Sequence, residues 1–303
     1  MISRKLKKSV LVPIIFFNWF NFPLTIKEIR RYLWQGELSE ENIIDVIKEF
    51  TQINYQDGQV WHGKDRGKRI DQQQLADQLW QVVGKWRWLF SLIPFLSEVY
   101  VTNTLAYNNV HTNSDIDLLV VAKPGRLWTT RLFLIMWLNL FKLRVKSIQR
   151  FKKFSPEFFV SEKALNIKSL ALEHDYYLSY WLADLVSIWP DGEHRKFRQA
   201  NSWFKDDLPI TWSSPKLKTY RYLRPTIWRL TLEKLLAGKW GQKLEDWAYY
   251  KQKKIIEKNV RRLGVHPSVT INHDIIKLHF NDRRALIRDV IETTLNDWLV
   301  KGK

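Results

Sequence analysis

The sequence predicts an α+β fold, and three features of the chain predict it. Apolar residues recur at helical spacing in several long segments, which indicates helices. An Asp-Gly pair at positions 57 and 58 separates two short runs containing apolar residues, which indicates a β-hairpin. The continuous apolar run 118–122 is typical of a strand that is buried on both faces of a sheet. At 303 residues, the chain is long enough for about two domains of ordinary size.

The composition limits the classes of function. Hydrophobic residues make up 45% and charged residues 26%, which is ordinary for a globular protein. The absence of cysteine excludes a disulfide scaffold, a thiolate zinc site and a cysteine nucleophile, and it fits a reducing cytoplasm. The 49 Lys and Arg against 31 Asp and Glu leave a charge of +18, which favours polyanions as partners: nucleic acid, nucleotide phosphates or an anionic membrane surface.

The first 69 residues predict three helices followed by a hairpin. The first helix is expected over 7–19, the second begins with a capping box at 25–28, and the third follows Ser39. The hairpin spans 53–61 around the Asp-Gly pair, because both turn residues must adopt φ > 0. Three helices and a hairpin in this order are typical of a winged helix, which mediates protein contacts as readily as DNA contacts.

Two further domains are expected, one at 70–165 that carries a sheet and one at 166–303 that is mainly helical. In the first of these we expect a helix at 71–92, a strand at 99–102, a polar loop to 114, a strand at 115–122, a helix at 126–141 and a strand at 157–160. In the second we expect helices at 173–188, 194–204, 225–237, 240–261 and 283–300, with a short β element at 269–280.

The end of the polar loop carries the candidate chemistry. Asp115 and Asp117 are two residues apart on a predicted strand, so their side chains leave the same face. Two such carboxylates repel each other unless a cation neutralises them, and Mg²⁺ prefers one or two carboxylates together with substrate phosphates. The pair is therefore half of a two-metal phosphoryl-transfer site. The alternative is a pair of aspartates that only caps a turn at the start of the strand.

At this motif the chain resembles the nucleotidyltransferase superfamily of DNA polymerase beta, whose members have Gly-Ser, a loop, and then Asp-x-Asp or Asp-x-Glu on a strand. Four other segments are similar to an uncharacterised bacterial group in which a winged helix precedes a nucleotidyltransferase domain: 17–25 (Phe-Asn-Trp-Phe-Asn-Phe-Pro-Leu-Thr), 125–131 (Gly-Arg-Leu-Trp-Thr-Thr-Arg), 201–203 (Asn-Ser-Trp) and 277–280 (Lys-Leu-His-Phe). The resemblance covers most of the chain. It implies that the central sheet is a polymerase-beta-like mixed sheet with flanking helices.

The resemblance also implies a metal site. Asp115 and Asp117 would bind Mg²⁺ or Mn²⁺, and a third carboxylate would come from a neighbouring strand and help to deprotonate the acceptor hydroxyl. Glu157 is the candidate for this third carboxylate, and its alternative is an exposed glutamate at the start of a strand. Glu162 is the weaker substitute.

Four residues form the expected nucleotide-binding set: Asn103, Thr104, Ser114 and Arg126. Thr104 takes the place of the family serine, which holds the outgoing phosphates, and Asn103 takes the place of the glycine. Asn103 departs from the family pattern, because asparagine tolerates left-handed backbone but adds a side chain where phosphate must approach closely. Arg126 follows the metal strand and is expected to reach a phosphate.

Two basic segments are candidates for contact with nucleic acid. The first has no acid among its six bases and leads into the Glu157 strand: Lys142, Arg144, Lys146, Arg150, Lys152 and Lys153. It is either a phosphate track or a solvated basic face. The second, within 208–232, interleaves bases with Tyr220, Tyr222 and Trp228, which suits stacking on single-stranded nucleic acid as well as packing in a core.

We therefore expect a metal-dependent nucleotidyltransferase, which moves a nucleoside monophosphate from an NTP to a hydroxyl of RNA, protein or a small molecule and releases pyrophosphate. The alternative is a non-catalytic winged-helix protein, nucleic-acid-binding or regulatory, with a degenerate core, and Asn103 is the feature in its favour. A membrane-surface protein is a third possibility, supported only by a short apolar run near the N-terminus. We expect a cytoplasmic protein with neither a signal peptide nor a transmembrane segment.

Overall fold

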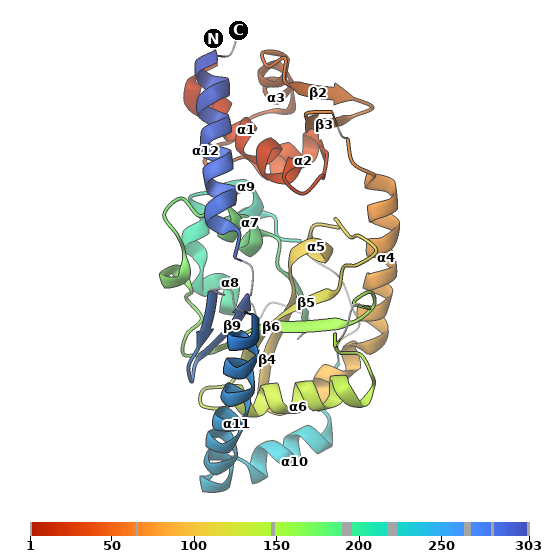
Figure 1. Cartoon of the computed structure of the whole chain (residues 1–303), viewed down its shortest axis with the longest axis vertical. Coiled ribbons are helices and arrows are strands. Elements are labelled where there is room, and N and C mark those ends of the chain that lie inside the picture. The colour runs from red at the N-terminus through yellow and green to blue at the C-terminus, as the bar shows by residue number, and fades with distance from the viewer. Residues whose placement is uncertain are drawn as a thin grey trace.

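The protein combines two sheets with surrounding helices, which confirms the α+β class (Figure 1). The computed structural model describes residues 2–64, 66–146, 149–189, 196–216, 223–263, 268–279 and 282–301. The small sheet lies at one end of the molecule, and the helices α10 (Ile227–Leu235) and α11 (Lys239–Leu263) lie at the other (Figure 1). No helix in these described segments is both long and apolar enough to cross a membrane.

The N-terminal unit contains three helices and a three-stranded antiparallel sheet of order β1-β3-β2. Its helices are α1 (Arg4–Asn18), α2 (Ile26–Arg31) and α3 (Glu40–Lys48), and its strands are β1 (Leu24–Thr25), β2 (Ile53–Gln56) and β3 (Gln59–His62). The three helices and the hairpin follow one another as expected. The two-residue strand β1 was not expected, because it forms only by pairing with β3.

Local signals in this unit act as expected. The Thr25 hydroxyl accepts a hydrogen bond from the Glu28 backbone N–H at 3.3 Å, and the Glu28 carboxylate accepts one from the Thr25 N–H at 2.9 Å, which completes the capping box. Asp57 and Gly58 adopt φ of 51° and 72°, so both turn residues of the hairpin are left-handed. These elements follow from residues within a few positions of one another.

The large sheet is mixed and has the strand order β7-β4-β5-β6-β9-β8. Its strands are β4 (Leu96–Val101), β5 (Ile116–Ala122), β6 (Phe154–Ser161), β7 (Val186–Trp189), β8 (Ser268–Ile271) and β9 (Ile275–His279). Only β5 and β6 pair in parallel, and the helix α6 (Leu127–Leu140) makes the crossover between them. Because the crossover returns the chain to the same edge, both strands begin side by side.

Three strands of this sheet come from the range that we expected to be mainly helical. The expected helix 173–188 is wrong at its end: α7 stops at Ala183 and Val186–Trp189 form β7. Pairing with β4 gives these four residues a partner that their local pattern does not reveal. The remaining helices are α4 (Arg69–Trp86), α5 (Asn103–Ala106), α7 (Tyr176–Ala183), α8 (Lys196–Ala200), α9 (Pro209–Ser213) and α12 (Arg284–Lys301), with 3₁₀ turns at Arg87–Leu92, Lys168–Leu170 and Ser202–Lys205. Residues 194–195 and 280, at the ends of expected elements, lie outside the described residues.

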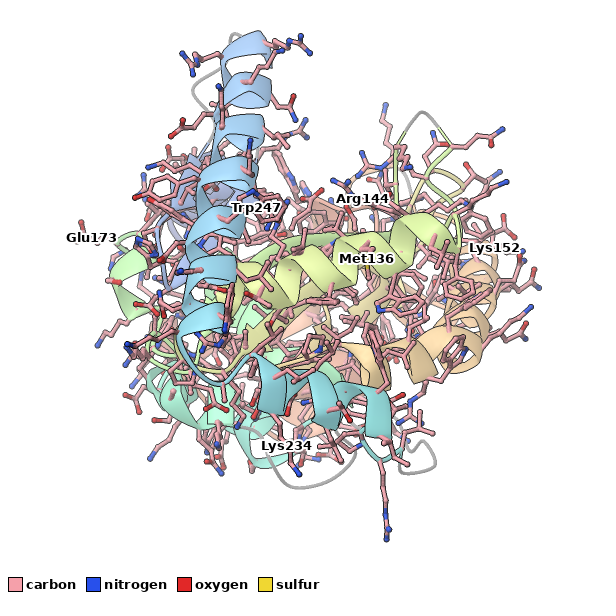
Figure 2. All side chains as sticks on the ribbon, turned by 90° about the horizontal axis from the view of Figure 1, so that it is seen from below. Met136, Arg144, Lys152, Glu173, Lys234 and Trp247 are labelled. Atoms are coloured by element: carbon pink, nitrogen blue, oxygen red, sulfur yellow. The ribbon has the colours of Figure 1, made fainter. Side chains whose placement is uncertain are left out.

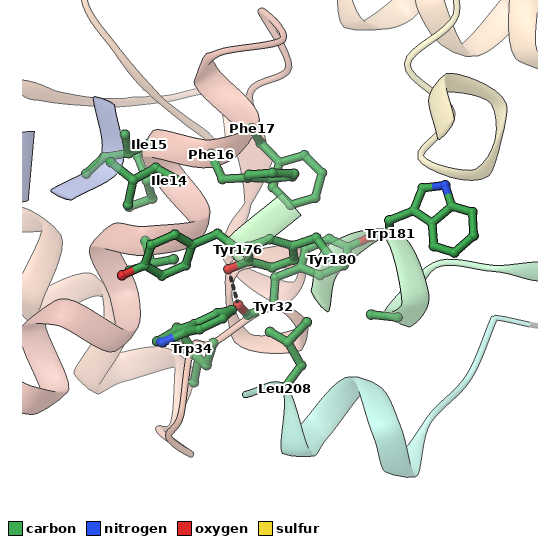
Figure 3. Close-up of a cluster of buried hydrophobic side chains, with 14 of the residues drawn as sticks. Ile14, Ile15, Phe16, Phe17, Tyr32, Trp34, Tyr176, Tyr180, Trp181 and Leu208 are labelled. Carbon is green, nitrogen blue, oxygen red and sulfur yellow. Dashed lines mark hydrogen bonds between the residues drawn. The ribbon is translucent and has the colours of Figure 1, made fainter. Parts of the chain in front are cut away.

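Two apolar cores cover the two faces of the large sheet. Leu119 and Phe158 face a core that continues through α7 and α12 into the N-terminal unit, whereas Leu118 and Phe159 face a core built with α4, α6 and α11. In the first core the Tyr180 hydroxyl donates a hydrogen bond to the Tyr32 carbonyl at 3.0 Å (Figure 3). The N-terminal unit and the sheet are therefore joined by one continuous core.

Candidate functional site

The candidate site lies where β5 and β6 begin. In the parallel ladder Asp117 is opposite Ser155, directly after the loop that ends with Asp115. The register then shifts: Leu118 pairs with Pro156 and Leu119 with Phe158, so the ladder skips Glu157. Glu157 is the extra residue of a β-bulge, a feature that redirects a side chain. The two parallel strand starts therefore bring Asp115, Asp117 and Glu157 into one neighbourhood.

The pKa values of Asp117 and Glu157 are raised in the folded protein. Burial raises the pKa of Asp117 well above its usual value, and the negative charges of Asp115 and Glu157 raise it further. Burial also raises the pKa of Glu157, with a contribution from the charge of Asp115, while a hydrogen bond from the Ser155 hydroxyl at 2.9 Å opposes the shift. Burial is therefore the main cause of both shifts, and repulsion between neighbouring carboxylates adds to it.

Two side chains hold the aspartates. Arg150 donates to one carboxylate oxygen of Asp115 through Nη2 at 2.7 Å and Nε at 3.2 Å, and this interaction raises the pKa of Arg150. The Asn103 amide donates to Asp117 at 3.0 Å and accepts from the Tyr177 hydroxyl at 3.2 Å. In the described part of the chain, Arg150 and Asn103 therefore bond to the aspartates, and the Ser155 hydroxyl bonds to Glu157.

The donor chemistry of the site fits a hard divalent cation. Carboxylate oxygens are the ligands that Mg²⁺ prefers, and Asp115 at the end of the loop and Asp117 on β5 supply them. Among the described residues, no three carboxylate, thiol or imidazole groups converge closely enough to hold one metal ion. Glu157 also lines a cavity of about 380 Å³ between β6, α6 and α11. This cavity lies on the face of the sheet that α6 and α11 cover, whereas Asp117 shares the opposite face with Leu119. Glu157 is therefore near the aspartates without joining them in one set of metal ligands among the described residues.

Asn103 begins α5, a short helix in the segment that we expected to be a polar loop. Its φ is 55°, the left-handed conformation for which glycine is the usual residue. Thr104 follows in the first turn, half-buried, and its carbonyl accepts a hydrogen bond from the Asn109 N–H at 2.8 Å. The backbone at Asn103 therefore takes a conformation that suits glycine, while its side chain reaches Asp117.

Asn103→Gly is expected to be more stable than Asn103→Ala by about 1 kcal/mol. Both variants lose the amide that contacts Asp117, but only alanine suffers the steric cost of left-handed backbone. Urea unfolding of the two variants side by side measures the difference. Equal stabilities would mean that the position does not hold a positive φ in solution.

Ser114 lies next to the aspartates and shapes the loop that leads to them. Its hydroxyl accepts a hydrogen bond from the His111 N–H at 3.0 Å, and its own N–H donates to the His111 carbonyl at 2.9 Å. Ser114 therefore closes the turn directly before Asp115. Its expected contact with a nucleotide stays a prediction.

The structure does not bring Arg126 to the aspartates. It follows β5, so it lies beyond the far end of a strand that begins at the site, about 16 Å along the strand from Asp117 to Ala122. Its guanidinium donates to the carbonyls of Leu236 and Ala237 at 3.0 and 3.2 Å. Arg126 therefore ties α6 to the segment before α11, and the expectation that it contacts a phosphate at this site is wrong.

Glu162 also lies away from the aspartates. It follows the far end of β6, where its carboxylate accepts hydrogen bonds from Ser97 at 2.5 Å and from Lys123 at 3.1 Å. Of the two candidates for the third carboxylate, Glu157 is the one whose charge acts on Asp117.

The first basic segment does lie at the site edge of the sheet, because it connects α6 to the start of β6. Only Arg150 of its six bases bonds to a site carboxylate; Arg144 lines the cavity that Glu157 lines. Lys153 donates to the Lys142 carbonyl at 2.6 Å, and the remaining side chains, Lys142, Lys146 and Lys152, are exposed. In the second segment, Tyr220 and Tyr222 lie outside the described residues.

Tyr177 reaches the site from α7, where its hydroxyl bonds to Asn103, and it was not among the expected site residues. Burial raises the pKa of its hydroxyl, and the charge of Asp117 raises it further. Tyr177 also lines a cavity of about 260 Å³ on the same face of the sheet as Asp117 and Leu119, where its neighbours include Trp19, Phe20, Phe158, Trp181 and Lys277. No motif marks Tyr177, because it stands among apolar residues in a helix whose packing places it.

The function of the protein is inferred from the geometry of the site alone, because the comparisons with known proteins found no match. No protein-family model, curated protein or solved structure matches the chain. The resemblance to the polymerase-beta superfamily therefore stays a prediction, which depends on the Asp115–Asp117 motif and its surroundings.

Proposed function

We propose that the protein is a metal-dependent nucleotidyltransferase, which transfers a nucleoside monophosphate from an NTP to an acceptor hydroxyl and releases pyrophosphate. The observation that carries this proposal is the crowding of Asp115, Asp117 and Glu157 at the start of two parallel strands, where burial and repulsion raise the pKa of Asp117. Buried like charges cost stability, so a group of carboxylates that retains them is a candidate for function. Magnesium or manganese, when bound, would stabilise the charge that develops during phosphoryl transfer.

The residues of the chain divide the work. Asp115 and Asp117 would hold the metal ions, and Glu157, whose pKa is raised, would accept the proton of the acceptor hydroxyl. The left-handed backbone at Asn103 supports its correspondence to the family glycine, with Thr104 beside the outgoing phosphates. Arg150 supplies positive charge at the same edge.

Two further features support the proposal. The aromatic cavity beside Tyr177 offers space for part of a substrate. The three helices and the β1-β3-β2 sheet of the N-terminal unit have the order of a winged helix, which would bind the nucleic acid or protein that carries the acceptor. The net charge of +18 favours a polyanionic acceptor, so RNA is the acceptor that we propose first. An enzyme that consumes NTPs would work in the cytoplasm, which is the location that we propose.

A specific observation favours the alternative, a non-catalytic winged-helix protein with a degenerate core. Arg150 and Asn103 already bond to Asp115 and Asp117, and no preformed three-carboxylate set occurs in the described residues. In that case Arg150 takes the place of the cation, and nucleic-acid binding or regulation is the function.

The deciding experiment measures transfer of label from labelled NTPs, with Mg²⁺ or Mn²⁺, to total RNA, to the protein itself and to small hydroxyl acceptors. We expect transfer that disappears with EDTA and in the Asp115→Ala/Asp117→Ala variant. The variant Asp45→Ala/Asp77→Ala makes the same charge change at exposed helical positions and should keep the activity. Absence of transfer to every acceptor, with unchanged nucleic-acid binding by the Asp115→Ala/Asp117→Ala variant, would favour the alternative.

A further inference from the structure

The helices α10 and α11 expose an unusual amount of apolar surface. Of the fifteen large apolar side chains that are exposed in the described residues, eight belong to these two helices, so the exposure is concentrated at one end of the molecule. Trp240 is 76% exposed and Ile227 is 83% exposed. The set, called the outer face below, is Ile227, Trp228, Leu230, Leu235, Trp240, Trp247, Tyr250 and Ile255. Monomeric proteins rarely expose so many large apolar groups together unless they serve an interaction.

The packing of α11 explains why these side chains point outward. Its inner side is held against α6: the Glu245 carboxylate accepts hydrogen bonds from the Trp128 and Thr129 N–H groups at 2.9 and 2.8 Å. Trp240 and Trp247 are seven residues apart, so they share the opposite side of the helix. The inner side of α11 therefore packs against the rest of the protein, whereas the side that carries Trp240 and Trp247 is exposed to solvent.

Lysines stand among the exposed aromatic residues. Lys251, Lys254 and Lys258 are exposed and, by helical spacing, lie on the same side of α11 as the tryptophans. Residues 223–263 contain 11 Lys and Arg against 4 Asp and Glu. Nine of these bases are exposed and none of the four acids is, so the surface of this segment is basic as well as apolar.

The outer face lies on one side of the molecule. Viewed from below, α10, α11 and α6 are all turned toward the viewer, with Lys234, Trp247 and Met136 on them (Figure 2). Met136 and Leu140 of α6 are also exposed, at 45% and 64%. All three helices therefore present exposed side chains to this side of the molecule.

We propose that the outer face binds the surface of an anionic membrane. Tryptophan and tyrosine favour the level of the lipid headgroups, and lysines reach from there to anionic phosphates along their apolar stems. Exposed aliphatic side chains such as Ile227 and Leu235 gain by entering the acyl boundary, as in interfacial helices. The protein would lie on the membrane without crossing it.

The same features disfavour other partners. Nucleic acid would contact the Lys and Arg side chains and the aromatic rings. It has no apolar surface that would bury the exposed aliphatic side chains, which are Ile227, Leu230, Leu235 and Ile255. A second copy of the chain in a two-fold dimer would place like charges of this region against each other, which opposes association. An anionic lipid surface satisfies both the charge and the aliphatic residues.

The test is flotation of the full-length protein with vesicles of phosphatidylcholine alone or of equal phosphatidylcholine and phosphatidylglycerol. We expect binding to the anionic vesicles only. Trp240→Ala/Trp247→Ala is expected to weaken the binding about tenfold or more, because it removes the apolar area that enters the interface. Lys251→Gln/Lys254→Gln/Lys258→Gln is expected to weaken it about a hundredfold at low salt.

Matched controls at the opposite end of the molecule are Tyr55→Ala, which removes an exposed aromatic ring, and Lys5→Gln/Lys27→Gln/Lys48→Gln, which makes the same charge change. Both should bind vesicles nearly as well as the wild type. Circular dichroism checks that each variant is folded. Equal losses in the control and outer-face variants would overturn the proposal.

Two other results would also overturn it. One is the lack of vesicle binding together with RNA binding that the outer-face variants lose. The other is the lack of vesicle binding together with a dimer that Trp240→Ala/Trp247→Ala dissociates in light scattering.

Discussion

Replacement of Asp117 by asparagine is expected to lower the rate of nucleotidyl transfer at least about a thousandfold, while the folded protein becomes no less stable. Asparagine keeps the shape of the side chain and can still accept the hydrogen bond from the Asn103 amide. It removes the negative charge that the proposed metal ions require. Activity and stability should therefore separate, which distinguishes a functional carboxylate from a structural one.

The sign of the stability change follows from the raised pKa of Asp117 in the folded state. A carboxyl group with a higher pKa in the folded than in the unfolded state binds more protons when folded, so it lowers stability as pH rises from its ordinary pKa through the raised one. Above that range the full penalty is present. Asp117→Asn removes the penalty. The unfolding free energy of the variant should therefore equal that of the wild type in acid and exceed it increasingly as the pH rises to neutral.

Urea unfolding at about pH 4 and pH 7.5 measures this gain, beside the transfer assay at neutral pH. Asp45→Asn, at an exposed position, is the control and should change neither quantity. A variant that is less stable than the wild type at neutral pH would show that the charge of Asp117 serves the fold. Full retention of transfer would remove Asp117 from the catalytic site.

Tyr180→Ala is expected to cost about 3–5 kcal/mol of unfolding free energy, the range for removing a large aromatic side chain from a core. Tyr180 is completely buried, and its ring stacks on Phe16 with 4.4 Å between the ring centroids. Its hydroxyl also satisfies the Tyr32 carbonyl, so α7 is joined to both α1 and the end of α2 (Figure 3). The variant leaves a cavity where the N-terminal unit meets the rest of the protein.

Urea unfolding followed by far-ultraviolet circular dichroism and by tryptophan fluorescence measures this cost. Because the core is continuous, both signals should report one transition at a lower urea concentration. Tyr180→Phe should lose only about 1 kcal/mol, the contribution of one hydrogen bond. The exposed Tyr55→Ala is the control, and its stability should stay within about 0.5 kcal/mol of the wild type. Two separate transitions in the wild type would contradict a shared core.

Most single elements could be predicted from the sequence, because their signals are local. The capping box at Thr25 and Glu28 and the turn at Asp57 and Gly58 each depend on residues within a few positions of one another. The apolar run of β5 likewise marks a strand buried between two layers. The motif of Asp115 and Asp117 was recognisable because its spacing alone places both carboxylates on one face.

The errors occur where distant segments decide the result. Val186–Trp189 form a strand because they pair with β4, and no pattern within these four residues predicts that pairing. Arg126 was assigned to the site by its distance in sequence, but a strand carries the chain away from the point where it started. The crossover α6, in contrast, returns Arg150 to Asp115 across thirty-five positions.

The α+β class, the hairpin unit, the buried strand and the pair of aspartates follow from local sequence, because neighbouring residues set backbone preference and side-chain direction. Contacts between distant segments place the groups around the pair: Glu157 at a bulge, Tyr177 through the packing of α7, and Arg150 through a crossover. Such contacts also turn the tryptophans of α10 and α11 outward. Burial, charge repulsion and exposure depend on what lies opposite a residue, and this is set by distant parts of the chain.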